Sequence, residues 1–533
     1  MERKQVLALV LLFGAIVAAS RLPLAPGQLF SYDDVNFAYA IGDFNPRVSQ
    51  PQPPGYPLFV LQTRILFWLR FRRPESNLLA IALLGSTAAV VALAWAGNRI
   101  LGGDTGYCAA WLLVFHHSFW YAGVTSALRV QLALVSAVVA ATCWRAWRGE
   151  RRGIYSSAVA LGLAAGIRPA LGLLLFPLWA VGAWRAGGWR DRRRGLALLS
   201  AVILAWLIPT VIASGGPVDY ARSCWEYLAD QSALTSGLFG AAAARWQATI
   251  CWMAVWGFSG VLAWPLAAIF AWRRGGGLGY SWTQVAFLGL WLAPSLVFAV
   301  LVHIADAGQA LAMVPVVCLV GGYLASRAAS RLDPWVPRAH AVVLFLLPSL
   351  FLDALIFFRP VWYYQGPAAT GWGAAAHRVW ADLHTGMSFS SLAQMRGIAW
   401  VDDMAFTELR RLAAEKPGNT VVLWERGRTS ARKTGYYFQN LPLVVLSPRK
   451  IAGDSTPVAR FMRGPRVERL LEGGPPLRVP LPAGARLIWM VEPKSDFFRD
   501  LRQSFPLTDA DLYYNDLPAG GGEQRVGDYL FAW

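Results

Sequence analysis

The sequence predicts an α-helical protein that crosses a membrane many times and ends in a separate α/β domain. Of its 533 residues, 56% are hydrophobic and only 15% are charged, whereas a soluble globular chain carries about 25% charged residues. The mean hydropathy is +0.40. The chain also contains 26 Trp, a residue that concentrates at membrane–water interfaces. These observations favour a transmembrane domain over residues 1–358 and an extramembrane domain over residues 359–533.

The net charge of +18 indicates membrane topology and does not call for a nucleic-acid partner. Much of the basic charge lies in short runs between apolar segments, as in cytoplasmic loops that obey the positive-inside rule. These runs are Arg145–Arg152, Arg185–Arg194, Arg273-Arg274 and Arg327–Arg338.

The first apolar run, Val6–Ser20, follows Glu2-Arg3-Lys4 and predicts a retained span with a cytoplasmic N-terminus. A cleaved signal peptide is the alternative, because Ala18-Ala19-Ser20 offers small residues. Alternate crossing of the membrane then gives about eleven spans, each expected to need about 20 apolar residues. The ten later candidates are Asn77–Ile100, Tyr107–Val124, Leu128–Ala146, Tyr155–Ile167, Leu171–Trp184, Leu196–Ala213, Ala248–Trp272, Val285–Val302, Ala310–Ala325 and Ala339–Phe357.

The first outer loop, residues 23–76, is predicted to contain two helices lying on the membrane surface. Val35–Ile41 is apolar at helical spacing, and Tyr56–Leu69 is apolar with Arg64 in its middle. Tyr56–Leu69 is too short to cross a bilayer. If it did cross, the basic runs would be placed outside. The pair Arg168-Pro169 interrupts a later apolar region and predicts either a broken helix or a hairpin.

Residues 359–533 are richer in charge and are expected to form one α/β domain with its own core. Strand-like runs occur at Thr420–Trp424, Leu443–Leu446 and Arg486–Val491, and helix-like runs at Phe406–Lys416 and Ala431–Phe438. The same threading of the membrane places this domain outside the cytoplasm.

Metal and nucleotide motifs are missing from the sequence. The five Cys are odd in number and include no Cys-x-x-Cys pair, so neither a disulfide framework nor a thiolate zinc site is indicated. Phosphate-cradling, zinc-protease and hydrolase motifs are also absent. We therefore leave the cofactor unknown: a divalent metal would have no clear ligand set.

The outer loop carries an acidic pair, Asp33 and Asp34, about ten residues past the first span. Carboxylates there avoid the cost of burial at the bilayer centre, which is about 2.5–3.5 kcal/mol on insertion scales. One of them could accept a proton from a hydroxyl nucleophile. Repulsion between the two would raise the proton affinity of one. From spacing alone, a solvated pair without function is the simpler explanation.

The acidic pair is followed by an Ala/Tyr-rich segment and a proline turn, Gln50-Pro51-Gln52-Pro53-Pro54-Gly55-Tyr56-Pro57. Together these features resemble the type C integral membrane glycosyltransferases, and most closely the protein O-mannosyltransferase and aminoarabinose-transferase groups. The resemblance runs from the first span to about Pro177, with Gly166-Ile167-Arg168-Pro169 as a weaker match. No internal repeat is found, and the C-terminal sequence matches no family.

The resemblance implies a membrane glycosyltransferase that moves a hexosyl or pentosyl group from a polyprenyl-phosphate donor to an extracytoplasmic hydroxyl, with inversion. It implies that Asp33 is the general base and that Asp34 assists it. The sequence departs from the family in two places. Gln52 stands where relatives often have Lys or His, and the stretch 127–131 lacks an acidic residue that relatives often carry.

Other residues are expected to bind substrate. Arg168 and Arg129 are predicted near the outer surface within apolar sequence, where pairing with a lipid phosphate would satisfy them; snorkelling to headgroups is the alternative. Gln52 and Tyr56 belong to the proline turn. His303 and Asp306 share a short outer loop, where a structural hydrogen bond is the simpler explanation.

The expected partners are a lipid-linked sugar donor, an acceptor glycan, lipid or protein, and the bilayer itself, with no nucleic acid. The expected location is a bacterial-type inner membrane. Two other functions stay open: a transporter or flippase of a lipid-linked sugar, and a non-catalytic envelope assembly factor. A transporter would typically show internal repeats and midplane charges, and neither is evident here.

Overall fold

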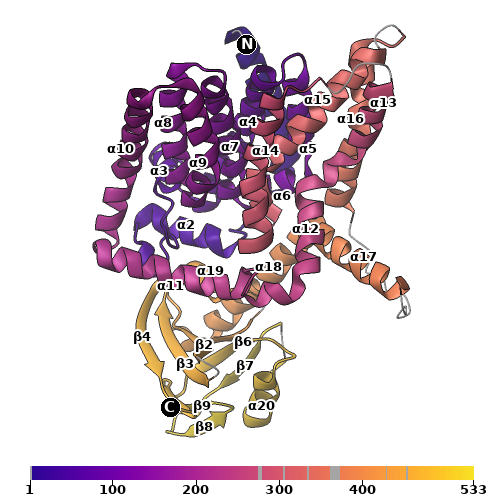
Figure 1. Ribbon diagram of the computed structural model, residues 1–533. Helices are drawn as coiled ribbons and strands as arrows, with labels where there is room; N and C mark the ends of the chain where they lie inside the picture. The colour runs from indigo at the N-terminus through magenta and orange to yellow at the C-terminus, as the bar shows by residue number, and fades with distance from the viewer. Residues whose placement is uncertain are drawn as a thin grey trace. The chain divides into compact units, whose positions relative to one another are not determined.

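The computed structural model describes residues 3–273, 279–303, 307–332, 335–359, 372–427, 429–451, 454–509 and 511–533. The chain divides into two compact units, which are drawn in Figure 1. The first unit comprises Met1–Gln28 and Ala40–Met395, and the second comprises Leu29–Tyr39 and Arg396–Trp533. The predicted division between residues 358 and 359 falls beside residues 360–371, which lie outside the described ranges, and it stays a prediction.

The first unit is built from helices, and seven of them in the described part are long and apolar enough to cross a bilayer. This confirms a polytopic membrane protein. The seven are Lys4–Leu24 (α1 with the short η1), Pro74–Ile100 (α4), Ala127–Trp147 (α7), Pro169–Ala186 (α9), Trp189–Ala213 (α10), Trp282–Val302 (α14 with η5) and Arg338–Phe358 (α16).

The other predicted spans are shorter, interrupted or less apolar, so the number eleven stays a prediction. The run predicted at 107–124 breaks at His116 into two helices, and the run at 248–272 breaks at the one-turn helix η4, Ser259–Leu262. The elements concerned are α5 (Thr105–Phe115), α6 (His117–Thr125), α8 (Arg151–Ile167), α12 (Trp246–Phe258), α13 (Ala263–Arg273) and α15 (Val314–Leu332).

The Arg168-Pro169 interruption is a hairpin. Arg168 is extended, with φ −149°, and Pro169 starts α9, so the chain reverses and α9 packs against α8 (Figure 1). Proline at the first helical position needs no backbone N–H and is already near helical φ. A proline at the first helical position also starts α3 at Pro57, α4 at Pro74 and α11 at Pro217.

Both helices predicted in the first outer loop are present. They are α2, Tyr32–Gly42, and α3, Pro57–Trp68. At 12 residues, α3 is too short to span. The remaining helices of the first unit are α11 (Pro217–Thr235), the short η2, η3 and η6 (Pro46–Val48, Ala241–Arg245 and Ala307–Ala312), and α17 (Trp372–Phe389).

The second unit contains a six-stranded sheet in the order β4-β3-β2-β1-β6-β7 and a three-stranded sheet in the order β5-β9-β8. The central strand β1 is parallel to both β2 and β6, and the outer pairs are antiparallel. The strands are β1 (Thr420–Glu425), β2 (Leu443–Ile451), β3 (Asp454–Arg463), β4 (Arg466–Glu472), β5 (Leu477–Pro480), β6 (Arg486–Val491), β7 (Tyr513–Asp516), β8 (Glu523–Val526) and β9 (Tyr529–Ala532), with helices α18 (Leu392–Glu415), α19 (Ala431–Tyr437) and α20 (Asp496–Ser504).

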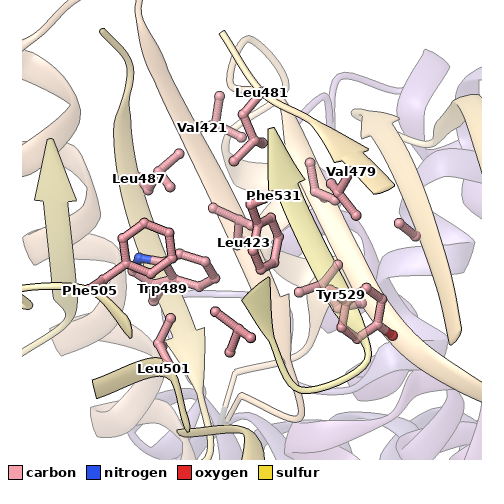
Figure 2. Close-up of a cluster of buried hydrophobic side chains, with 14 of the residues drawn as sticks. Val421, Leu423, Val479, Leu481, Leu487, Trp489, Leu501, Phe505, Tyr529 and Phe531 are labelled. Atoms are coloured by element: carbon pink, nitrogen blue, oxygen red, sulfur yellow. The ribbon is translucent and has the colours of Figure 1, made fainter. Parts of the chain in front are cut away.

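The large sheet is buried on both faces at its centre, as expected of parallel strands. Because side chains alternate along a strand, β1 sends Val421 and Leu423 to one face and Val422 to the other. The first face packs against α20 and the small sheet, around Trp489 and Phe531 (Figure 2). The second face packs against α18. The α/β fold class predicted for the C-terminal region is therefore confirmed.

Candidate active site

The acidic pair lies in the first turn of α2, and the two carboxylates have different environments. Asp33 is half-buried. Asp34 is 5% exposed and closes a capping box with Ser31. The Ser31 backbone N–H and hydroxyl donate to Asp34 Oδ2 at 3.0 and 2.8 Å, and the Asp34 N–H donates to Ser31 Oγ at 3.1 Å. One carboxylate therefore serves the helix cap, while its neighbour remains partly accessible.

Burial sets the protonation of Asp34. Desolvation raises the pKa of its carboxyl to about 7, and the charge of Asp33 raises it further, whereas the Ser31 hydrogen bonds and the charge of Lys433 lower it. Near neutral pH both protonation states of this carboxyl are therefore populated. The expectation that one member of the pair has raised proton affinity agrees with this environment, although burial rather than repulsion is the main cause.

The segment before α2 is held by a lysine from the C-terminal region. Lys433, on α19, donates to the Phe30 carbonyl at 3.0 Å and pairs with Asp402 on α18. The side chains of Lys433 and Asp402 are 5% and 6% exposed, so the charges are balanced within the unit. The Leu29 N–H also donates to the Tyr437 hydroxyl at 2.9 Å.

The middle of α2 is held by the neighbouring arginine. Arg432 Nε donates to Asn36 Oδ1 at 3.0 Å, and its guanidinium lies 4.8 Å from the centre of the Tyr39 ring. The Tyr39 ring also meets Tyr436 edge-on at 5.1 Å. Helix α19 therefore packs against α2, the helix that carries the acidic pair, and holds it in place.

The proline turn belongs to the first unit and is tied to α11. Tyr220 Oη donates to the Pro54 carbonyl at 3.0 Å, and Arg47 pairs with Asp219 at 3.2 Å. Gly55 has φ +107°, and a Cβ there would lie 3.1 Å from Pro46 Cγ, so only glycine fits. The predicted substrate contacts Gln52 and Tyr56 are buried in this turn at 2% and 7% exposure.

The predicted phosphate ligands lie at helix ends of the first unit. Arg168 is the residue between α8 and α9, beside a cavity of about 20 Å³ that Ser295 and Gln309 also line. Arg129 lies in the first turn of α7. Both are partly buried.

The expected His303–Asp306 pair is only half described. His303 Nδ1 hydrogen-bonds to Thr235 Oγ1 at the end of α11, and Asp306 lies outside the described residues. Asp33 and Asp34 belong to the second unit, whereas Gln52, Tyr56, Arg129, Arg168 and His303 belong to the first. Their roles in binding and catalysis stay predictions.

A mostly apolar groove of about 370 Å³ opens between α3, α4 and α7. Leu84 and Ile65, which line it, are 62% and 44% exposed. The full lining is Gln62, Ile65, Leu66, Ile81, Leu84, Gly85, Ala88, Gln131 and Leu134.

One polar cluster was missed in the sequence. His116, His117 and Asp353 lie together inside the helical unit, although each stands in a run whose sequence predicts a plain apolar span. The available signal was an ionisable residue within such a run, which is a functional-site hypothesis by default.

No protein-family model matches the chain, and no curated protein matches it in sequence. Among solved structures, ArnT from Cupriavidus metallidurans bound to undecaprenyl phosphate aligns with a TM-score of 0.50 at 14% identity, covering 83% of this chain and 85% of that one. The chain has an ArnT-like fold. This confirms, at the level of the fold, the predicted resemblance to type C integral membrane glycosyltransferases.

Two further structures align at lower TM-scores. ArnT in the apo state gives a TM-score of 0.47 at 13% identity, covering 84% of this chain and 97% of that one. The Archaeoglobus fulgidus oligosaccharyltransferase gives 0.41 at 13% identity, covering 81% and 61%.

Proposed function

We propose that this chain is a membrane glycosyltransferase that moves a sugar from a polyprenyl-phosphate donor to an acceptor hydroxyl on the extracytoplasmic side of a bacterial-type inner membrane. The observation that carries the proposal is the unequal environment of the acidic pair. The Asp34 carboxylate accepts the hydrogen bonds that cap α2, whereas Asp33 beside it is half-buried at the helix N-terminus. The ArnT-like fold supports the proposal, and the ArnT structure was solved with undecaprenyl phosphate bound.

In the proposed reaction Asp33 accepts the proton of the acceptor hydroxyl as its oxygen attacks the anomeric carbon. The bond from that carbon to the phosphate oxygen breaks, the configuration inverts, and polyprenyl phosphate leaves with the bonding electrons. Arg168, with Arg129, would balance the charge that develops on the phosphate. Gln52 and Tyr56 would contact the substrate.

The groove between α3, α4 and α7 is the proposed site for part of the polyprenyl tail. Its lining is mostly apolar and its volume is about 370 Å³, which suits hydrocarbon. One wall of the groove is α3, a short helix of the kind that is expected to lie at the interface between lipid headgroups and acyl chains.

The test is a transfer assay with the full chain in lipid nanodiscs, a panel of undecaprenyl-phosphate sugars and a mixture of acceptors. Asp33→Asn should lower turnover by about 10²–10⁴-fold, because a positioned general base contributes about that much. Asp43→Asn is the matched control: Asp43 is exposed and follows α2 directly.

Equal turnover in the wild type and Asp33→Asn would remove the base assignment. Movement of the lipid-linked sugar across the bilayer without cleavage of its phosphate bond would instead favour a flippase.

A further inference from the structure

A group of ionisable side chains is buried inside the helical unit at the break between α5 and α6. His116 is the residue between the two helices, and His117 begins α6. Asp353 lies on α16, a helix apolar enough to span the membrane. Their exposures are 2%, 0% and 1%. Ionisable groups in such positions are costly and are usually retained for a purpose.

Two of the three residues are connected by hydrogen bonds. His117 Nδ1 lies 2.8 Å from Asp353 Oδ1, and the same oxygen accepts from the Ser259 hydroxyl at 2.7 Å and from the His117 backbone N–H at 3.3 Å. On the other side of the ring, His117 Nε2 lies 3.2 Å from Ser118 Oγ, which donates to the Trp256 carbonyl.

The third residue is not accounted for by these contacts. The His116 ring stacks on the His117 ring at 5.1 Å. Among the described residues, neither nitrogen of His116 has a hydrogen-bond partner of normal geometry; the Gly257 backbone is near enough only for a minor interaction. A buried polar group left in this state costs about 1–3 kcal/mol, and such an exception calls for an explanation.

We propose that His116, His117 and Asp353 bind a divalent transition-metal ion of the zinc type. One ligand atom from each of the three residues lies within 4.8 Å of the others. Two imidazoles and one carboxylate are a common protein ligand set for Zn²⁺, with bonds of about 2.0–2.2 Å. An ion between His117 Nδ1 and Asp353 would replace the proton that they share and would give the His116 ring a partner.

The expected role of the ion is structural. It would join the break between α5 and α6 to α16, at a sequence separation of 236 between His117 and Asp353, and the Ser259 contact adds η4. Its charge would also compensate the Asp353 carboxylate in an apolar interior, where an uncompensated charge is expensive. The site shares no residue with the acidic pair on α2, and its proposal does not depend on the proposed reaction.

The experiment measures bound metal in the full chain, purified in detergent on a tag without histidine and without added chelator. We expect about one zinc-type ion per chain, held by three protein ligands with the fourth position of a tetrahedral site left for water. His116→Ala and Asp353→Asn should lower metal affinity by more than about 100-fold, since even loss of an outer-shell partner costs 10–100-fold. His340→Ala is the matched control: this exposed histidine lies on the same helix as Asp353.

A second measurement does not rely on variants that fold. The metal-free wild type is titrated with Co²⁺, and visible absorption typical of a four-coordinate N/O site is expected, with competition by Zn²⁺. Wild-type protein that holds no ion and gives no Co²⁺ spectrum would overturn the proposal and leave a metal-free hydrogen-bonded cluster. Unchanged metal content in a monodisperse His116→Ala protein would overturn the ligand assignment.

Discussion

Asp33 and Asp34 are adjacent in the sequence, but α2 gives their carboxylates different surroundings. The pattern Ser31-x-x-Asp34 is a capping box that could be recognised from sequence alone, and it would have separated the structural acid from the accessible one. The burial of Asp34 could not be recognised, because it comes from residues of the C-terminal region that pack around α2.

The raised pKa of Asp34 predicts a pH-dependent stability. In the unfolded chain this carboxyl titrates near 3.9, and in the folded protein burial raises the pKa to about 7. Between these values the folded state holds a proton that the unfolded state has released, so the free energy of unfolding should fall as pH rises from about 4 to about 7.

Asp34→Asn should remove this part of the slope, since the amide oxygen can still accept from the Ser31 N–H. The measurement is the apparent unfolding temperature of detergent-solubilised protein between pH 4.5 and 8. The exposed Asp403→Asn should keep the wild-type slope. Parallel curves for Asp34→Asn and the wild type would contradict the assigned burial.

At the scale of elements, α19 is the link between the C-terminal sheet and the acidic helix. Its Lys433 and Arg432 contact a segment about 400 residues earlier in the chain, at sequence separations of 403 and 396. The sequence predicted the helix itself, at Ala431–Phe438, from local pattern. It could not predict the partner, because nothing local to α19 indicates which distant segment satisfies its charges.

Lys433→Met should destabilise the second unit by about 3–5 kcal/mol, because it leaves the Asp402 carboxylate buried without its cation. Residues 29–39 should also lose protection, and hydrogen exchange followed by mass spectrometry should show faster exchange there. The double variant Lys433→Met/Asp402→Leu should recover much of the stability, since it removes both charges. Unchanged exchange in the single variant would show that Lys433 does not secure the acidic helix.

The groove between α3, α4 and α7 gives a second prediction at this scale. Ala88→Phe should occupy part of the groove and raise KM for the lipid-linked donor by about tenfold, with a smaller effect on kcat, because two displaced methylenes are worth about 1.6 kcal/mol. Ala197→Phe is the control: this alanine is exposed on the spanning helix α10. An equal KM in both variants would exclude the groove as the tail site.

For the whole molecule, composition predicted the fold class, which is confirmed, whereas the topology that the charge pattern predicts stays a prediction. The basic runs Arg145–Arg152 and Arg185–Arg194 bracket the turns α7–α8 and α9–α10. The α8–α9 hairpin separates those turns, so both turns lie at the same end of the four consecutive helices α7 to α10. The number of spans is harder to predict from the sequence than the fold class. Breaks within helices, such as the one at His116, depend on side chains supplied by other helices.

We predict that the basic turns and the C-terminal domain lie on opposite sides of the membrane. In a Cys224→Ser background, Gly520→Cys should react with a membrane-impermeant maleimide in intact cells, whereas Glu150→Cys should react only after permeabilisation. Gly520 has open space around its Cβ position, and replacing Glu150 leaves every basic residue of its turn in place. The four other native cysteines are buried and should give little background. The reverse labelling pattern would place Asp33 on the cytoplasmic side, since Asp33 and residue 520 belong to the same compact unit, and a lipid-linked donor would then have to be presented on the inner leaflet.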